Sequence, residues 1–204
     1  MPAHHLESYK GITARSPFFR IIKALEKSVS VCYVLDSNHC IIYCNPAWDQ
    51  FAKLNGAPEL AGDNVIGSSL FSAIPDMLTR YYMDAFVTVR RDEAVWERSY
   101  ECSSPGMCRK YRMRIHFMKG RDWFFITNPL IFERPHRCPV KPDPQKYIHT
   151  NGLITMCAHC RCSNRVDIPG QWDFVPDHLL ITGKASLNVS HGLCPICHAY
   201  FYPE

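Results

Sequence analysis

The chain has 204 residues, of which 47% are hydrophobic, and a formal net charge of +4 with histidine neutral. That length and apolar content predict one ordinary globular domain with a smaller companion. The small net charge gives no reason to expect nucleic acid or an anionic membrane as a partner. The apolar runs, such as 123–126, are far shorter than the roughly 20 residues of a membrane-spanning helix.

Residues 1–15 lack the charged start, apolar stretch and cleavage site of a secretory signal, and we expect a flexible N-terminus. The eleven cysteines are better read as reduced thiols than as a disulfide scaffold, because a chain of this size has apolar residues enough for a core. Both observations predict a cytoplasmic protein.

An amphipathic helix is predicted over 16–30. Ser16 is a suitable N-cap before Pro17, and apolar side chains recur at helical spacing at Phe18, Ile21, Ile22, Leu25 and Val29. This helix either covers one face of the following domain or pairs with the same helix of a second copy, which would make a homodimer.

The segment 31–133 is predicted to be an α+β domain. Two strands, 29–35 and 40–44, precede a short helix at 47–54 and a mostly helical stretch at 67–91. Three further strands are expected at 95–102, 107–118 and 121–132.

Charged residues alternate with apolar ones on two of these strands. Arg112, Arg114 and His116 share one face of 107–118, while Glu97 and Glu101 share one face of 95–102. Opposite charges on neighbouring strands cancel the field that a nucleic acid would feel, so we expect a solvated surface and not a nucleic-acid interface.

A linker is predicted at 134–150, because four prolines fall within the eleven positions 134–144. The remaining segment, 151–204, carries two Cys-x-x-Cys pairs, Cys157/Cys160 and Cys194/Cys197. Two such pairs complete a tetrahedron of thiolates with no open position, which is typical of a structural Zn²⁺ site. This cysteine-rich tail therefore predicts a metal centre without catalysis.

Other ligand sets remain open at this point. His191 would complete a Cys3His set, whereas His159 and His198 are expected to donate to the thiolates or face water. The same four thiols suit an iron–sulfur cluster. The run 194–198, Cys-Pro-Ile-Cys-His, matches the c-type haem attachment motif, but it would leave Cys157 and Cys160 unexplained.

The stretches 34–48 (VLDSNHCIIYCNPAW) and 65–71 (VIGSSLF) resemble the PAS family of sensor domains over roughly residues 28–133. The resemblance implies a five-stranded antiparallel sheet with helices over one face and an internal pocket whose ligand is unknown, and it does not imply an enzyme. The tail, with 156–160, 170–172 and 190–197 (SHGLCPIC), resembles a cysteine-rich zinc-binding tail that follows sensor domains in bacterial signalling proteins.

The resulting hypothesis is a non-enzymatic sensor that relays a signal to a separate effector protein. One alternative is a thiol-based redox switch, in which the extra thiol of Cys162 attacks a neighbouring sulfur and metal is released. Another is an iron- or haem-dependent redox or gas sensor, although residues 65–94 contain no histidine to serve as an axial haem ligand.

Overall fold

The computed structural model describes residues 17–104, 106–136, 143–181 and 188–203. The predicted flexible N-terminus, 1–15, lies outside this range. The chain forms two compact units: Met1–Ala73 with Phe86–Glu97 and Met113–Pro129, and Ile74–Ala85 with Arg98–Arg112 and Leu130–Glu204. One helix and two strands therefore contribute to both units.

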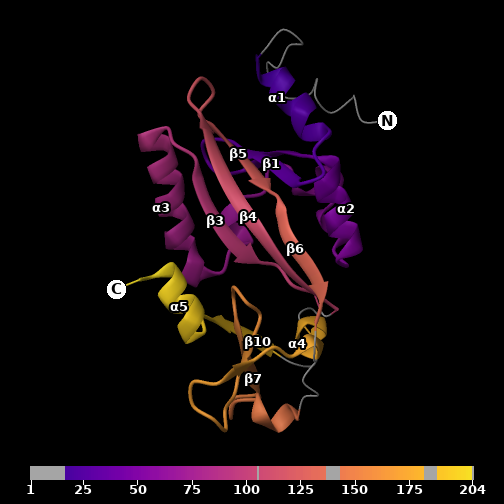
Figure 1. Ribbon diagram of the computed structural model, residues 1–204, viewed down its shortest axis with the longest axis vertical. Coiled ribbons are helices and arrows are strands. Elements are labelled where there is room, and N and C mark those ends of the chain that lie inside the picture. The colour runs from indigo at the N-terminus through magenta and orange to yellow at the C-terminus, as the bar shows by residue number, and fades with distance from the viewer. Residues whose placement is uncertain (1–16, 105, 137–142, 182–187, 204) are drawn as a thin grey trace. The chain divides into compact units, whose positions relative to one another are not determined.

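An antiparallel sheet carries the α+β part of the chain (Figure 1). Its strands follow the order β2-β1-β5-β4-β3, and β6 also pairs with β4. Their bounds are β1 Val31–Leu35, β2 Ile41–Cys44, β3 Trp96–Glu101, β4 Met107–Met118, β5 Trp123–Asn128 and β6 Leu130–Pro135. The predicted α+β fold with an antiparallel sheet is confirmed.

One predicted strand, 121–132, is two strands in the structure. Pro129 separates β5 from β6, because proline has no N–H to donate to a ladder. β5 then pairs with Arg114–Met118 of β4, and β6 pairs with Met107–Tyr111. Because β6 continues to Pro135, the first residues of the predicted linker are in a strand.

Three helices accompany this sheet: α1 Pro17–Glu26, α2 Pro46–Leu54 and α3 Asp76–Asp92. The predicted helix over 16–30 thus ends earlier than expected, and Val29 is 97% exposed instead of facing inward. Asn45 caps α2 by accepting a hydrogen bond from the Trp48 N–H. The side chain of Asn45 is fully buried and also bonds the backbone of β1 and of the α1–β1 connection.

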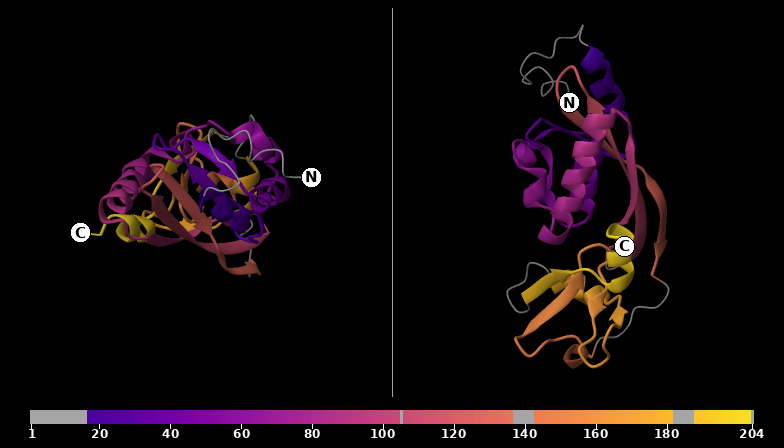
Figure 2. Two further views of the ribbon diagram at one scale, coloured as in Figure 1. Left: turned by 90° about the horizontal axis from the view of Figure 1, so that it is seen from above. Right: turned by 90° about the vertical axis from the view of Figure 1, so that its left-hand side faces the viewer.

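Helices α1 and α3 cover opposite faces of the sheet, because consecutive residues of a strand point to opposite sides. On β5, Phe124 packs against Phe86 of α3 with ring centroids 4.9 Å apart, whereas Phe125 packs against Phe18 of α1 at 5.5 Å. The α3 side is shown from a second direction in Figure 2. The predicted covering role of the first helix is therefore confirmed.

The cysteine-rich tail contains a second sheet with the order β10-β7-β8-β9. Its elements are β7 Leu153–Cys157, β8 Ser163–Asn164, β9 Trp172–Asp173, α4 Pro176–Ile181, β10 Asn188–Gly192 and α5 Pro195–Phe201. β10 and β7 run parallel. Tyr147, Ile154, Met156 and Val175 are buried and form a core, so the tail has its own apolar interior.

Candidate metal centre

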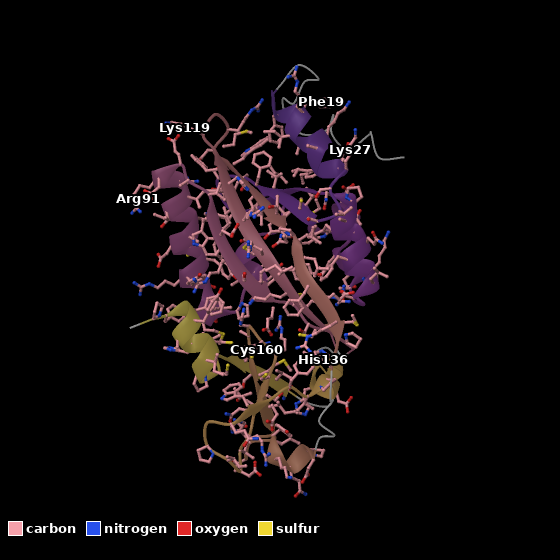
Figure 3. The ribbon with its side chains drawn as sticks, in the orientation of Figure 1. Phe19, Lys27, Arg91, Lys119, His136 and Cys160 are labelled. Atoms are coloured by element: carbon pink, nitrogen blue, oxygen red, sulfur yellow. The ribbon has the colours of Figure 1, made fainter. Side chains whose placement is uncertain are left out.

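The structure brings the two Cys-x-x-Cys pairs together. The sulfur atoms of Cys157, Cys160, Cys194 and Cys197 all lie within 4.8 Å of one another. Cys160, labelled in Figure 3, is partly exposed, whereas the other three are buried. The four thiols that the spacing singled out therefore lie at one point, and their binding of a metal stays a prediction.

The first pair is held by a tight turn at the end of β7. The Arg161 N–H donates to the Cys157 carbonyl at 3.1 Å, and the Cys157 N–H donates to the Cys162 carbonyl at 2.7 Å. Arg161 adopts a positive φ of 64°, which a non-glycine residue seldom does. These bonds stabilise that conformation, and the turn directs both sulfurs to the same side.

The second pair is held by the beginning of α5. Cys194 is the N-cap, Pro195 occupies the first turn, and the Cys197 N–H donates to Cys194 Sγ at 3.4 Å. The Cys194 N–H also donates to Cys157 Sγ at 3.5 Å. Backbone N–H groups at a helix N-terminus favour negative charge, so this geometry stabilises thiolates.

One edge of the cluster has the length expected of a tetrahedral zinc site. A Zn–S bond of about 2.3 Å gives an edge of roughly 3.8 Å between sulfurs of a regular tetrahedron, and Cys160 Sγ lies 3.8 Å from Cys194 Sγ. Thiolates are soft ligands that suit zinc or iron–sulfur centres. The residues present therefore fit a bound metal with four thiolate ligands.

Proton sharing among the thiols favours one thiolate. Hydrogen bonds from the thiols of Cys157, Cys162 and Cys197 hold the pKa of Cys160 well below its usual range. Burial raises the pKa of the Cys194 thiol to about 11. A metal cation would replace the remaining protons, because its ligands must be thiolates.

His159 links this cluster to β3. Its Nε2 accepts a hydrogen bond from the Glu101 N–H at 3.3 Å, so that nitrogen carries no proton. The proton of the neutral ring is then on Nδ1, which lies 3.2 Å from Cys197 Sγ and donates to it. Burial lowers the pKa of His159, which agrees with a neutral ring. The expectation that His159 donates to a thiolate stays a prediction, and the structure places its Nδ1 at hydrogen-bond distance from the Cys197 sulfur.

Aromatic residues of α5 extend the same contact. The Tyr200 hydroxyl donates to the Ser99 carbonyl at 3.0 Å, and the Arg98 guanidinium lies 3.8 Å from the Tyr200 ring centroid. Phe201 packs edge-on against Tyr81 of α3, with 4.8 Å between ring centroids. Arg98, Tyr81 and Tyr200 were not predicted as site residues, since their partners lie about a hundred positions away in the sequence.

The remaining predicted residues take other positions. Among the described residues, the set of close ligand atoms contains the four cysteines and no histidine. His191 lies on β10, and His198 is exposed on α5. The Cys162 thiol hydrogen-bonds to Cys160. Cys194 and Cys197 share their site with Cys157 and Cys160, the two thiols that haem attachment would leave unexplained.

In the described part of the chain, no helix combines the length and the hydropathy that crossing a membrane requires.

No protein-family model matches the chain, and no curated protein matches it. Solved structures of PAS domains are similar to part of it. The PAS domain of the Cronobacter turicensis RpfR quorum-sensing receptor, in complex with BDSF, is 18% identical, with a TM-score of 0.40 over 52% of this chain and 97% of that one. A PAS domain from Colwellia psychrerythraea is 13% identical, with a TM-score of 0.42 over 57% and 98%. The PAS domain of an HTR-like protein from Haloarcula marismortui is 17% identical, with a TM-score of 0.36 over 56% and 96%.

Proposed function

We propose that this chain is a non-enzymatic, cytoplasmic sensor module of the PAS type, in which a structural zinc site couples the sheet to a separate effector protein. The observation that carries the proposal is the link from Cys197 through the His159 ring to the backbone of Glu101. Through this link, a change at the metal centre and a change in β3 affect each other.

Zinc is the proposed ion because four thiolates close its coordination shell and leave no position for substrate. The ligands of this ion would be the thiolates of Cys157, Cys160, Cys194 and Cys197. A bound ion cross-links the turn after β7 to the start of α5, and its binding free energy adds to the folding free energy of the tail. The His159 and backbone donors offset the negative charge of the thiolates.

Signal relay is proposed to run through α5. Tyr200 and Phe201 contact Ser99, Arg98 and Tyr81, so α5 packs on β3 and on the first half of α3. The N-terminus of α5 is itself a ligand segment of the metal centre. Displacement of β3 would therefore move a helix that is anchored at the metal, and the effector would read the position of that helix.

Two measurements test the proposal. Elemental analysis of protein purified without added metal should find about one zinc per chain; iron at similar occupancy would instead support a redox or gas sensor. Hydrogen exchange should be slower at the Glu101 amide in metal-loaded protein than after chelation, because His159 then holds that N–H. Equal exchange rates would refute the relay even if zinc were present.

Homodimer formation through α1 is part of the same proposal. Beside α1 lies a groove of about 350 Å³, lined by Ile21, Leu25, His116, Met118 and Thr127 among others. The exposed sides of α1 from a second copy would cover it. Light scattering at micromolar concentration should report a dimer, and Leu25→Glu should convert it to monomer; a monomeric wild type would refute this part.

The redox switch is a second candidate, because the Cys162 thiol hydrogen-bonds to Cys160, the most exposed of the four ligands. Oxidation by hydrogen peroxide would join the two sulfurs, with both thiols losing their hydrogens and peroxide reduced to two waters. The thiolate ligand would then be lost and the metal released. Peroxide should release zinc from the wild type and not from Cys162→Ser; release at equal rates would exclude this switch.

A further inference from the structure

A cavity of about 690 Å³ lies beside the metal centre, within the second compact unit. Ser99, Glu101 and Lys110 of β3 and β4 form one wall, and Trp172, Ile196 and Tyr200 of the tail form another. Small-molecule sites typically measure about 300–1,000 Å³ and combine apolar walls with a few polar groups. This cavity has that size and that composition.

Glu101 and Lys110 face each other across the strand pair. The Cys102 N–H donates to the Arg109 carbonyl at 3.2 Å, and Tyr100 stacks on Tyr111 with 5.7 Å between ring centroids. This register makes Glu101 the direct neighbour of Lys110, and both side chains are half-buried. The surface predicted to be solvated at this point therefore lines a cavity.

These two charges attract each other, but no ion pair joins the two described side chains. The next pair along the same strands, Arg114 and Glu97, closes to 2.6 Å. In the described part of the chain, neither Glu101 nor Lys110 has an ion-pair partner within 4.0 Å. The Glu101 carboxylate and the Lys110 ammonium group can therefore each pair with an oppositely charged group of a ligand.

The opposite wall offers apolar contact. Trp172 packs against the thiol cluster, and Ile196, between the two cysteines of the second pair, is 83% exposed. An exposed branched side chain and an aromatic ring can bury an aliphatic or aromatic group of a ligand. The wall with Glu101 and Lys110 therefore offers one charge of each sign. The wall with Trp172 and Ile196 offers apolar contact.

We propose that this cavity binds a small zwitterion, a free amino acid or dipeptide with an apolar side chain. Its ammonium group pairs with Glu101, its carboxylate pairs with Lys110, and its side chain packs against Trp172 and Ile196. The inference goes beyond the proposed function: zinc only supports the wall, and recognition needs no chemistry from the metal.

Calorimetric titration of the full-length, reduced protein with L-leucine, L-phenylalanine and L-leucyl-L-phenylalanine tests the proposal. We expect saturable 1:1 binding of at least one of the three. Glu101→Gln and Lys110→Met should each weaken it at least tenfold, and N-acetyl-leucine amide, which lacks both charges, should not bind. No binding of any probe at 10 mM, or undiminished binding to both variants, would overturn the proposal.

A matched control is available on the same strands. Glu97→Gln and Arg114→Met remove the neighbouring opposite pair, which does not line the cavity, and both should bind the probe like the wild type. An equal loss in these controls would overturn the assignment to Glu101 and Lys110. Zinc content, measured on every sample, separates the two proposals: protein purified without any metal contradicts the zinc-dependent function, and binding of the probe to that protein still supports the cavity.

Discussion

Replacement of His159 by phenylalanine should weaken metal binding without unpacking the tail. The phenylalanine ring keeps the stacking volume beside Tyr200 and Phe201, since His159 contacts both rings. It removes the Nδ1–H donor to Cys197 Sγ and the Nε2 acceptor for the Glu101 N–H. Only the two hydrogen bonds are lost.

The expected loss of zinc affinity is about 10–100-fold, which equals roughly 1.4–2.7 kcal/mol. It arises because a thiolate loses a donor that offsets its charge, and because the half-buried Glu101 N–H is left without its partner. Competition with a chromogenic zinc chelator at pH 7.4, in the presence of a reductant, measures the affinity directly.

His198→Phe is the matched control, because His198 also adjoins Cys197 but is exposed on α5. It should leave zinc affinity unchanged within twofold. If His159→Phe also stayed within twofold of the wild type, the hydrogen bond to Cys197 would have no role in stabilising the metal centre. Faster hydrogen exchange at Glu101 in His159→Phe alone would confirm the second half of the link.

Three further predictions concern stability. Asn45→Ala removes five side-chain hydrogen bonds and should lower the free energy of unfolding by about 2–4 kcal/mol in urea titration; a loss below 1 kcal/mol would contradict its role. Phe124→Ala empties a fully buried position and should cost about 3–5 kcal/mol in the same assay. Burial holds the pKa of His178 below 6.5, so the unfolded chain takes up this proton first and stability is lost as the pH falls below 6.5. His178→Asn should lose less melting temperature than the wild type between pH 7.5 and 5.5, and an equal loss would assign the acid sensitivity to other groups.

Local patterns in the sequence predicted most elements. The helical pattern of 47–54 predicted α2, and the alternation within 107–118 predicted β4, because both signals depend on neighbouring residues. The gathering of the four cysteines was predictable because each Cys-x-x-Cys pair specifies its own turn. Pro129 was present as a signal for the break between β5 and β6, but it was read as part of one strand.

The contacts that surround the metal centre were not predictable in this way. His159 and Glu101 are 58 positions apart, and Arg98 and Tyr200 are 102 positions apart. Such pairs depend on the tertiary arrangement and leave no periodic pattern in the chain. Glu101 was assigned to a solvated face for the same reason: alternation shows which side of a strand a residue takes, but not what covers that side.

The hydrogen bonds of His159 couple metal binding to the position of β3. Metal binding should hold the Glu101 amide in place and so stabilise the present position of β3. Coupling between two equilibria is reciprocal, so displacement of β3 should lower the affinity for metal by the factor by which metal binding disfavours that displacement. The cavity beside the cluster is placed to bias this equilibrium, since Glu101 and Cys160 belong to its walls. A ligand that bridges Glu101 and Lys110 would fix the side chain of a residue whose backbone already contacts the metal ligand set through one ring. The sign of the coupling is therefore positive: occupancy of the cavity should tighten zinc, and zinc should tighten the cavity's ligand.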